Sequence, residues 1–157
     1  MKIFKLEELS TIIAALKIEG KKIVHCHGCF DLMHPGHIKY FQASKKFGDI
    51  LIVTVTPDKF VDKGEKRPFF SQSLRSESIA ALECVDYVSI NEWETAENTL
   101  RMILPDVYVK GQEFEKFEDP TGKIQKEANV VKEIGAELRF THEIVFSSTK
   151  LLNKFFI

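Results

Sequence analysis

A chain of 157 residues, 44% of them hydrophobic, can fill one sizeable core but is too short for two ordinary domains. Its 22 lysines and arginines nearly balance its 23 aspartates and glutamates, which excludes the broad basic surface that binds nucleic acid or an anionic membrane. No apolar run approaches the length of a membrane span and no secretory pattern opens the chain, so we expect a cytoplasmic protein.

The predicted elements alternate between helices and strands along the whole chain. An amphipathic helix is predicted over 6–20, and β-branched apolar runs predict strands over 21–27, 49–55, 85–90, 105–110 and 136–141. Helical periodicity follows each strand, over 37–48, 73–84, 95–104, 124–135 and 148–156. This order predicts a doubly wound α/β fold with a five-stranded parallel sheet, as one domain over 1–157 with a leading helix in 1–20 and a core in 22–153.

In such sheets ligands bind beyond the carboxyl ends of the strands, where the direction of the winding changes. The distinctive short motifs of this chain fall at those ends: GCFD and HPGH after the first strand, TPDK after the second, NEWE after the third and KGQE after the fourth. We therefore expect a composite site built from several strand ends.

The HPGH motif places His34 and His37 three residues apart, with Pro35 and Gly36 between them. Proline is favoured at the first position of a helix, so we expect a helix to begin at Pro35. Both imidazoles then lie at a helix N-terminus, where free backbone N–H groups attract an anion, and a glycine lets a phosphate approach the backbone. The motif indicates phosphate binding, although a single histidine is more often a surface or capping residue.

A zinc site is the alternative for the HCHGC stretch, in which His25, Cys26, His27 and Cys29 are close together. Neighbouring strand residues point to opposite faces, and no second pair of ligands with zinc spacing completes a tetrahedral set, so we predict no metal site in the protein. The three cysteines are too few for a disulfide scaffold.

Six stretches carry a resemblance that covers about residues 22–153: GCFDLMHPGHIKYF, FGDILIVTVTPDKFV, KGEKRP, LRSESIAALECVDYV, PDVYVKG and FSSTKLLN. The chain resembles the nucleotidyltransferases marked by an HxGH motif, which have a Rossmann-like fold. Within them it is most similar to the cytidylyltransferase-like branch that holds heptose 1-phosphate adenylyltransferases and glycerol-3-phosphate cytidylyltransferases.

The resemblance implies that the phosphate of an acceptor attacks the α-phosphorus of a nucleoside triphosphate, with Mg²⁺, and releases pyrophosphate. An acceptor phosphate is already ionised near neutral pH, so the reaction needs no general base and depends on alignment and charge stabilisation. By the same resemblance His34 and His37 donate to the α- and β-phosphate oxygens, and Lys63 closes over the phosphates.

The resemblance also implies the residues of the binding site. Those expected to bind the nucleotide are Gly28, Phe30, Asp31, Gly36, Lys110, Gly111, Glu113, Ser147, Ser148 and Thr149, and those expected to contact the acceptor or a phosphate are Arg67 and Arg75. Simpler roles stay open: the hydroxyls of 147–149 as helix caps, Gly111 as a turn, Arg75 as a solvated cation, and Asp31 as a turn residue that orients the histidine loop.

Departures from the pattern bear on the substrate. His142 and Val145 stand where glycerol-3-phosphate cytidylyltransferases carry an arginine and a glycine, and Gln112 and Glu113 replace an acidic pair. KGEKRP and PDVYVKG favour an adenylyltransferase that uses ATP and a sugar phosphate. A CTP-dependent enzyme acting on a polyol or other small phosphate, and a non-catalytic nucleotide-binding module, remain alternatives. The apolar ending LLNKFFI predicts a homodimer.

Overall fold

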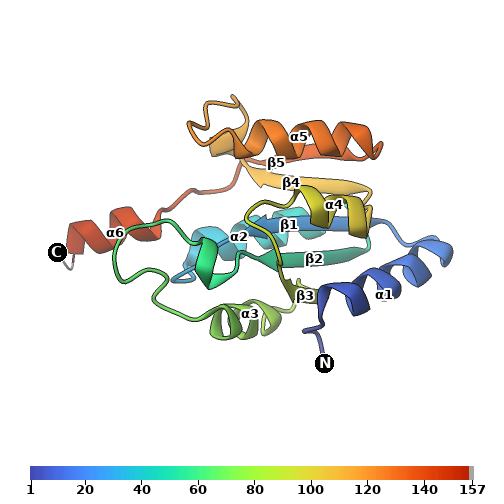
Figure 1. The fold of residues 1–157 in the computed structure, drawn as a ribbon, viewed down its shortest axis with the longest axis horizontal. Helices are drawn as coiled ribbons and strands as arrows, with labels where there is room; N and C mark the ends of the chain where they lie inside the picture. Colours follow the sequence, from blue (N-terminus) through green and yellow to red (C-terminus); the bar gives the residue numbers. More distant parts are fainter. Residues whose placement is uncertain (156–157) are drawn as a thin grey trace.

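The computed structural model describes residues 1–155, and its elements follow the predicted order (Figure 1). The strands are β1 (Ile23–Gly28), β2 (Ile50–Val55), β3 (Tyr87–Ile90), β4 (Val107–Gly111) and β5 (Glu137–Thr141). The helices are α1 (Leu6–Ile18), α2 (Pro35–Lys45), α3 (Gln72–Ala80), α4 (Glu97–Ile103), α5 (Lys123–Glu133) and α6 (Ser148–Phe155). Each predicted element is confirmed within a few residues at either end. Phe156, the last residue of the predicted final helix, lies outside the described residues.

The strands form one parallel sheet in the order β3-β2-β1-β4-β5, which confirms the doubly wound α/β prediction. Two short 3₁₀ turns, η1 (Asp58–Phe60) and η2 (Gln112–Phe114), follow β2 and β4. Because β1 has β2 on one side and β4 on the other, the winding changes direction at β1. The crevice beyond the ends of β1 and β4 is therefore the expected ligand position.

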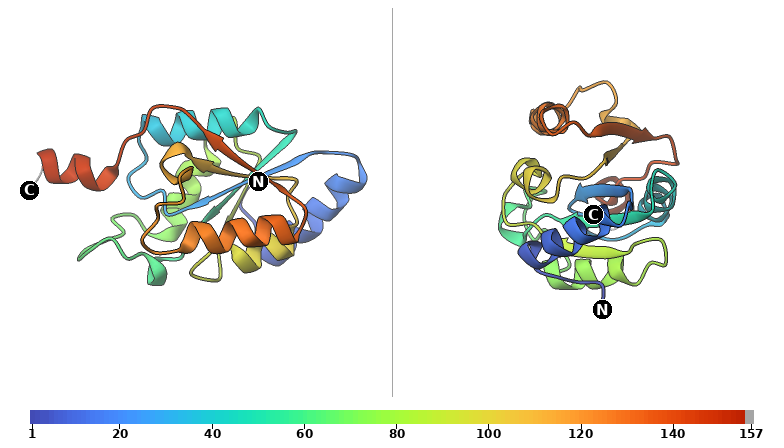
Figure 2. Two further views of the ribbon diagram at one scale, coloured as in Figure 1. Left: turned by 90° about the horizontal axis from the view of Figure 1, so that it is seen from above. Right: turned by 90° about the vertical axis from the view of Figure 1, so that its right-hand side faces the viewer.

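Helices cover both faces of the sheet. Apolar residues of α2 and α3, such as Phe41 and Ile79, pack with Val24, Val53 and Val109 on one face. Residues of α1, α4 and α5 pack on the other, where Leu9 and Ile103 contact Ile23 and Ile52, and Leu100 and Val130 contact Tyr108. The right view of Figure 2 shows α1, α4 and α5 along one side and α2 on the other. Strands that are covered on both faces are mostly apolar, which is why these runs in the sequence are nearly continuous, and β1 and β2 add only a few buried polar side chains such as His25, His27 and Thr54.

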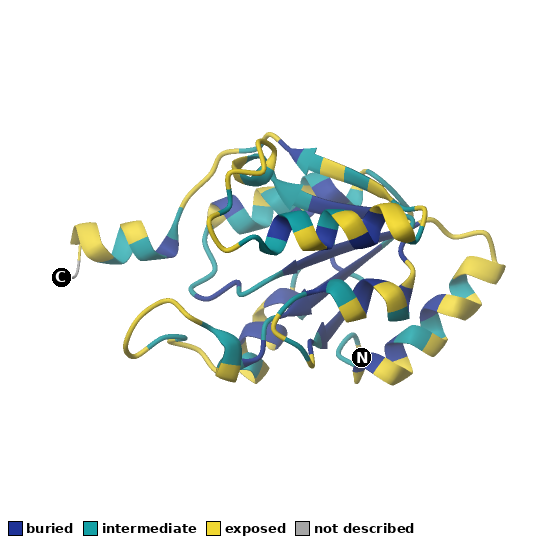
Figure 3. Ribbon diagram, turned by 45° about the horizontal axis from the view of Figure 1, so that its top comes forward, coloured by how far each residue is buried: buried dark blue, intermediate teal, exposed yellow. Residues whose placement is uncertain are grey.

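Two segments lie apart from this packed body. Figure 1 shows the loop after β2 and helix α6 at the same end of the molecule, and α6 extends away from the sheet. Figure 3 shows that the central strands are buried, whereas β5 at the edge is partly exposed and the stretch around 62–66 and the end of α6 are exposed. None of the helices in residues 1–155 combines the length and the apolar character needed to cross a bilayer.

Candidate functional site

Helix α2 begins at Pro35, as predicted, and this start positions the two histidines. His34 is the N-cap residue in extended conformation (φ −137°, ψ 168°), and His37 lies in the first turn. The His37 backbone N–H donates to Nδ1 of His34 at 3.4 Å, so His34 caps the helix with its ring. The two imidazoles stack with ring centroids 3.8 Å apart and an interplanar angle of 17°. Both rings therefore stand together at the positive end of the helix dipole.

Both histidines are neutral at pH 7. Burial lowers the pKa of His34, and burial together with the nearby His34 and Lys63 lowers the pKa of His37 to about 3. Nε2 of His34 and Nδ1 of His37 are buried and find no hydrogen-bond partner within residues 1–155. Since Nδ1 of His34 accepts a hydrogen bond, its proton sits on Nε2, and His34 has a free N–H donor for a ligand.

The aromatic side chain of Phe30 packs against the histidine pair. Phe30 has a left-handed backbone (φ 51°), and its ring packs edge-on against His37 and Phe41, with centroid distances of 5.4 and 4.9 Å. A Cβ at Gly28 would lie 2.9 Å from the Phe30 ring, so only glycine leaves room for it. At Gly36 a Cβ would lie 3.0 Å from the His34 ring. Gly28, Phe30 and Gly36 thus fix the positions of the two imidazoles.

A cavity opens beyond the imidazoles, here named the α2 cavity. Its lining comes from the ends of β1, β4 and β5 and includes nine of the predicted site residues: Gly28, Phe30, His34, Gly36, His37, Lys63, Lys110, Gly111 and Glu113. A side chain at Gly111 would collide with the Glu113 carboxylate, so this glycine lets Glu113 fold back over the strand end. The structure therefore brings together most of the site that the sequence predicts.

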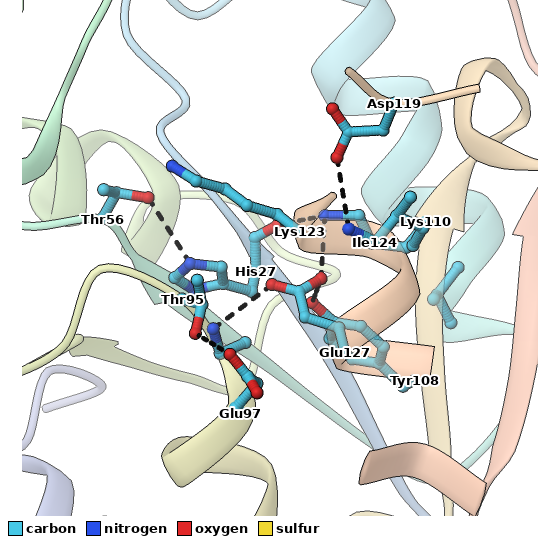
Figure 4. Close-up of polar contacts among 12 residues, drawn as sticks. His27, Thr56, Thr95, Glu97, Tyr108, Lys110, Asp119, Lys123, Ile124 and Glu127 are labelled. Carbon is cyan, nitrogen blue, oxygen red and sulfur yellow. Dashed lines mark hydrogen bonds and ion pairs between the residues drawn. The ribbon is translucent and has the colours of Figure 1, made fainter. Parts of the chain in front are cut away.

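A second cavity, here named the α5 cavity, lies beside the first and reaches the start of α5. His27, Gly28, Cys29, Lys63, Lys110 and Phe114 line both cavities and form a shared wall. Lys110 Nζ lies 3.3 Å from the His27 carbonyl oxygen and 3.7 Å from the Glu127 carboxylate. Figure 4 shows Lys110, Lys123 and Glu127 gathered around His27. The two cavities thus share a wall that carries two lysines, and the α5 cavity is lined in addition by the carboxylates Asp62, Glu94, Asp119 and Glu127.

Asp31 and Arg67 lie outside both linings and tie two loops together. The Asp31 carboxylate accepts from Arg67 Nε at 2.8 Å and from the N–H groups of Phe69 and Phe70 at 2.9 and 3.1 Å. Burial alone would raise the pKa of Asp31, but these hydrogen bonds and the Arg67 charge hold it below its ordinary value. These contacts tie Asp31 to the loop around Phe69, which fits the simpler of its two predicted roles, that of orienting the histidine loop.

Arg75 requires a correction. The sequence predicts a contact with the acceptor or a phosphate, but the guanidinium is buried and lies outside both cavity linings. It donates to the carbonyl oxygens of Cys29, Thr56 and Phe70 at 2.6, 2.8 and 3.0 Å, and it pairs with Asp58 at 2.7 Å. Nη1 also lies 3.8 Å from Cys29 Sγ, so all five N–H groups have a partner, and Arg75 fastens the loops that follow β1 and β2 with no donor left for a ligand.

The three hydroxyls of 147–149 also lie outside the cavity linings, and their contacts are internal. Ser147 Oγ accepts from the Lys150 N–H at 3.3 Å, which is the capping role left open by the sequence. Ser148 Oγ donates to the Asp31 carbonyl oxygen at 2.8 Å, and Thr149 Oγ1 accepts from Arg67 at 3.4 Å. The neighbouring Phe146 does line the α2 cavity, with its ring edge-on to His34 at 5.8 Å.

Several lining residues have no counterpart in the sequence prediction. Tyr40, Phe114 and the exposed apolar run 144–146 line the α2 cavity. His27 was considered only as a zinc ligand. The spacing of two along a strand does put His25 and His27 on one face, and that signal could have singled them out.

The HCHGC stretch makes no metal site in the part of the chain that the structure describes. Residues 1–155 contain no group of three His, Cys, Asp or Glu side chains arranged to hold a metal ion. His25 and His27 both contact Thr54 Oγ1 at 2.8 Å, whereas Cys26 points to the opposite face, where burial raises the pKa of its thiol to about 11.

Comparisons with known proteins agree with this geometry. The model of the family described as Cytidylyltransferase-like matches residues 25–154. The Bifunctional protein HldE of Geobacter metallireducens is 39% identical over 156 residues, which cover 98% of this chain and 31% of that protein. The HldE of Geobacter sulfurreducens is 43% identical over 115 residues, covering 72% and 24%. The chain thus spans less than a third of the length of these relatives.

Solved structures show the same architecture. The lipopolysaccharide core biosynthesis protein from Thermoplasma volcanium superposes with a TM-score of 0.67 at 26% identity, covering 80% of this chain and all of that one. The pantoate-beta-alanine ligase from Francisella tularensis superposes with a TM-score of 0.67 at 17% identity, over 98% of this chain and 73% of its own, and shows the fold alone. From the family match over residues 25–154, the chain belongs to the cytidylyltransferase-like family.

Proposed function

We propose that this chain transfers a nucleoside monophosphate from a nucleoside triphosphate, ATP by preference, to a phosphorylated sugar-like acceptor and releases pyrophosphate. The observation that carries the proposal is the stacked pair of neutral imidazoles at the start of α2, with polar atoms that find no partner within residues 1–155. Unsatisfied buried donors are costly, so a site that keeps them is built for a ligand that satisfies them.

In this mechanism the triphosphate lies in the α2 cavity with its α- and β-phosphates at the start of α2. His34 and His37 donate to oxygens whose negative charge grows as the bond to pyrophosphate breaks. Lys63, from the exposed segment after β2, adds a positive charge beside them. We infer that Mg²⁺ enters as the complex with the triphosphate, since phosphate oxygens are ligands that this ion prefers. The residues named here align the substrates and neutralise the negative charge of the phosphates, and none acts as a nucleophile or general base.

The acceptor lies in the α5 cavity, so that its phosphate meets the α-phosphorus at the shared wall. Lys63 and Lys110 in that wall attract a phosphate, and the polar groups Thr56, Asp119 and Thr121 suit the hydroxyls of a sugar. The KGEKRP and PDVYVKG stretches support a sugar 1-phosphate such as a heptose 1-phosphate over a polyol phosphate. The similarity to HldE proteins supports the same class, through the third or less of each relative that this chain spans.

A pyrophosphate-release assay tests the proposal. ATP, CTP, GTP and UTP are each combined with heptose 1-phosphate, hexose 1-phosphates and glycerol 3-phosphate in the presence of Mg²⁺. We expect release with one triphosphate only when an acceptor is present, and loss of release in the His34→Ala variant. Turnover with CTP and glycerol 3-phosphate alone would replace the adenylyltransferase proposal by the cytidylyltransferase. Triphosphate binding without turnover across the whole panel would identify a non-catalytic module.

We also propose a homodimer. Ile144, Val145 and Phe155 are 58, 49 and 64% exposed, and α6 extends away from the body, so apolar surface at this end is available to a second copy. The last two residues of the apolar ending, Phe156 and Ile157, lie outside the described residues. Light scattering at tens of micromolar should give twice the monomer mass of 18.0 kDa. A monomer mass with the C-terminus intact would refute the dimer.

A further inference from the structure

Three buried polar side chains form a chain that runs across β1 and β2 to the shared wall. Nε2 of His25 and Nδ1 of His27 both lie 2.8 Å from Thr54 Oγ1, and the three residues are at most 6% exposed. The other ring nitrogen of His27, Nε2, lies 3.5 Å from Thr56 Oγ1 (Figure 4). His27 lines both cavities, and Thr56 lines the α5 cavity.

Both imidazoles are neutral. Burial lowers the pKa of His25 to about 3, and burial with the charge of Lys110 lowers the pKa of His27 to about 3. Each ring therefore carries one N–H at pH 7 and offers one lone pair. The Thr54 hydroxyl has a single hydrogen to give and can accept from another donor.

The numbers of hydrogen-bond donors and acceptors decide which ring nitrogen of His27 carries the proton. If Thr54 donates to Nδ1 of His27 and accepts from Nε2 of His25, the atom left without a partner is the bare Nδ1 of His25, which is unpartnered within residues 1–155. The reverse direction would put an N–H on that buried nitrogen, and an orphaned donor is rarer than an orphaned acceptor. If both rings donated to Thr54, its own hydroxyl hydrogen would have no acceptor among the described contacts. The first arrangement is the best satisfied, and it protonates His27 at Nε2.

We propose that Thr54 holds His27 as its Nε2–H tautomer and that this N–H donates to an oxygen of the acceptor phosphate at the shared wall. The inference rests on the proposed function and names the group that recognises the acceptor. The 3.5 Å separation from Thr56 is the limit of a hydrogen bond, so the N–H can serve a ligand. Lys63 and Lys110 line the same wall and supply the positive charge. Because His27 is neutral, its remaining N–H is a much weaker acid than a phosphate, so it donates a hydrogen bond and keeps its proton, and the acceptor phosphate stays the nucleophile.

The tautomer can be observed directly. In protein labelled with ¹⁵N-histidine, two-bond ¹H–¹⁵N correlations distinguish the nitrogen that carries the proton from the bare one. We expect His27 to carry its proton on Nε2. We also expect that resonance to shift when inorganic phosphate is added while a non-hydrolysable triphosphate analogue fills the α2 cavity. A proton on Nδ1 of His27, or an Nε2–H that does not respond to phosphate, would overturn the inference.

Kinetics of Thr54 variants give the second test. Thr54→Val removes the hydroxyl that orients His27 and should raise the acceptor KM about tenfold, the value of one hydrogen bond, with the triphosphate KM changed less than about twofold. Thr54→Ser keeps the hydroxyl and should restore the acceptor KM. If the valine variant does not fold, the spectra of the parent protein still decide. An acceptor KM that is unchanged in Thr54→Val refutes this inference alone, whereas a parent protein without turnover refutes the proposed function.

Discussion

The two sides of the histidine loop differ in how their polar groups are satisfied. Behind the loop, Asp31 and Arg75 are buried, and their contacts are hydrogen bonds and ion pairs within the protein; on this side only Nη2 of Arg67 is a buried nitrogen without a partner in residues 1–155. In front of it, His34 and His37 each keep a buried ring nitrogen without a partner in residues 1–155. Satisfied polar groups contribute to stability, whereas unsatisfied ones cost it. Residues that stabilise the fold and residues proposed to bind the ligand therefore lie within a few positions of one loop. Substitutions in front of the loop should lower activity, and substitutions behind it should lower the free energy of unfolding.

The largest effect is expected from His37→Ala, on the side that faces the ligand. Loss of a donor to charge that develops in the transition state should lower kcat by about 10²–10³-fold, with a much smaller change in triphosphate binding. Steady-state kinetics and calorimetric titration of the triphosphate measure the two quantities. His142→Ala, at an exposed position, is the matched control. A folded His37→Ala protein that keeps more than about a third of the parent rate, where chemistry limits turnover, would remove the distinction between the two sides.

Arg75→Met tests the satisfied side. The change leaves three carbonyl oxygens and Asp58 without their donor, and we expect a loss of roughly 3 kcal/mol in the free energy of unfolding. Denaturant unfolding measures it. Arg101→Met removes an exposed pair with Glu133 and should leave the free energy of unfolding nearly unchanged. Equal losses in the two variants would show that the Arg75 contacts add nothing beyond those of a surface arginine.

Lys63→Ala tests an exposed residue that lines the cavities but has no role in the packing of the loop. Lys63 is exposed and lines both cavities, so its removal should lower kcat about 10- to 100-fold, the value of a charged hydrogen bond, with no change in the free energy of unfolding. Lys66→Ala in the same exposed segment is the control and should retain the parent rate. Similar kinetic losses in both variants would indicate a general effect of positive charge rather than a contact.

The pH dependence of stability that the buried pair His25 and His27 causes gives a further test. Their pKa values are about 3 in the folded protein against an ordinary value of 6.5, so the unfolded chain binds more protons between these limits. Their contribution is therefore complete above pH 6.5 and is lost as the pH falls toward 3, on the order of 1 kcal/mol per pH unit for each histidine. Urea unfolding from pH 7 to 5 should show a shallower slope for His25→Gln than for the parent. The exposed variant His142→Gln should keep the parent slope, and a slope unchanged in His25→Gln would contradict the assignment.

The fold could be predicted from the sequence because its signals are local. Apolar β-branched runs mark strands that are covered on both faces, and Pro35 marks the start of α2. The parallel sheet covered by helices follows from the alternation of strands and helices, whereas the order β3-β2-β1-β4-β5 was not predicted. The extension of α6 away from the sheet could not be predicted, because an amphipathic pattern does not say which surface will cover the apolar face.

The site could be predicted only where its residues sit on the motif itself. His34, Gly36 and His37 are fixed by one helix start, so their placement followed from the sequence. Arg75 could not be placed, because the direction of a long side chain depends on the carbonyl oxygens of Cys29 and Thr56, which the fold brings from distant parts of the chain. His27 was missed for the same reason, since its importance depends on Thr54 in the neighbouring strand.

The wall shared by the two cavities has a consequence for redesign of the protein. Ile144 and Val145 line only the α2 cavity, and Phe60 and Thr121 line only the α5 cavity. Libraries at the first pair could alter the choice of base while libraries at the second alter the choice of acceptor, and the two could be screened separately and then combined. Substitutions in the wall itself, at His27, Gly28 or Lys110, would disturb both substrates at once, so an engineer should leave these positions unchanged.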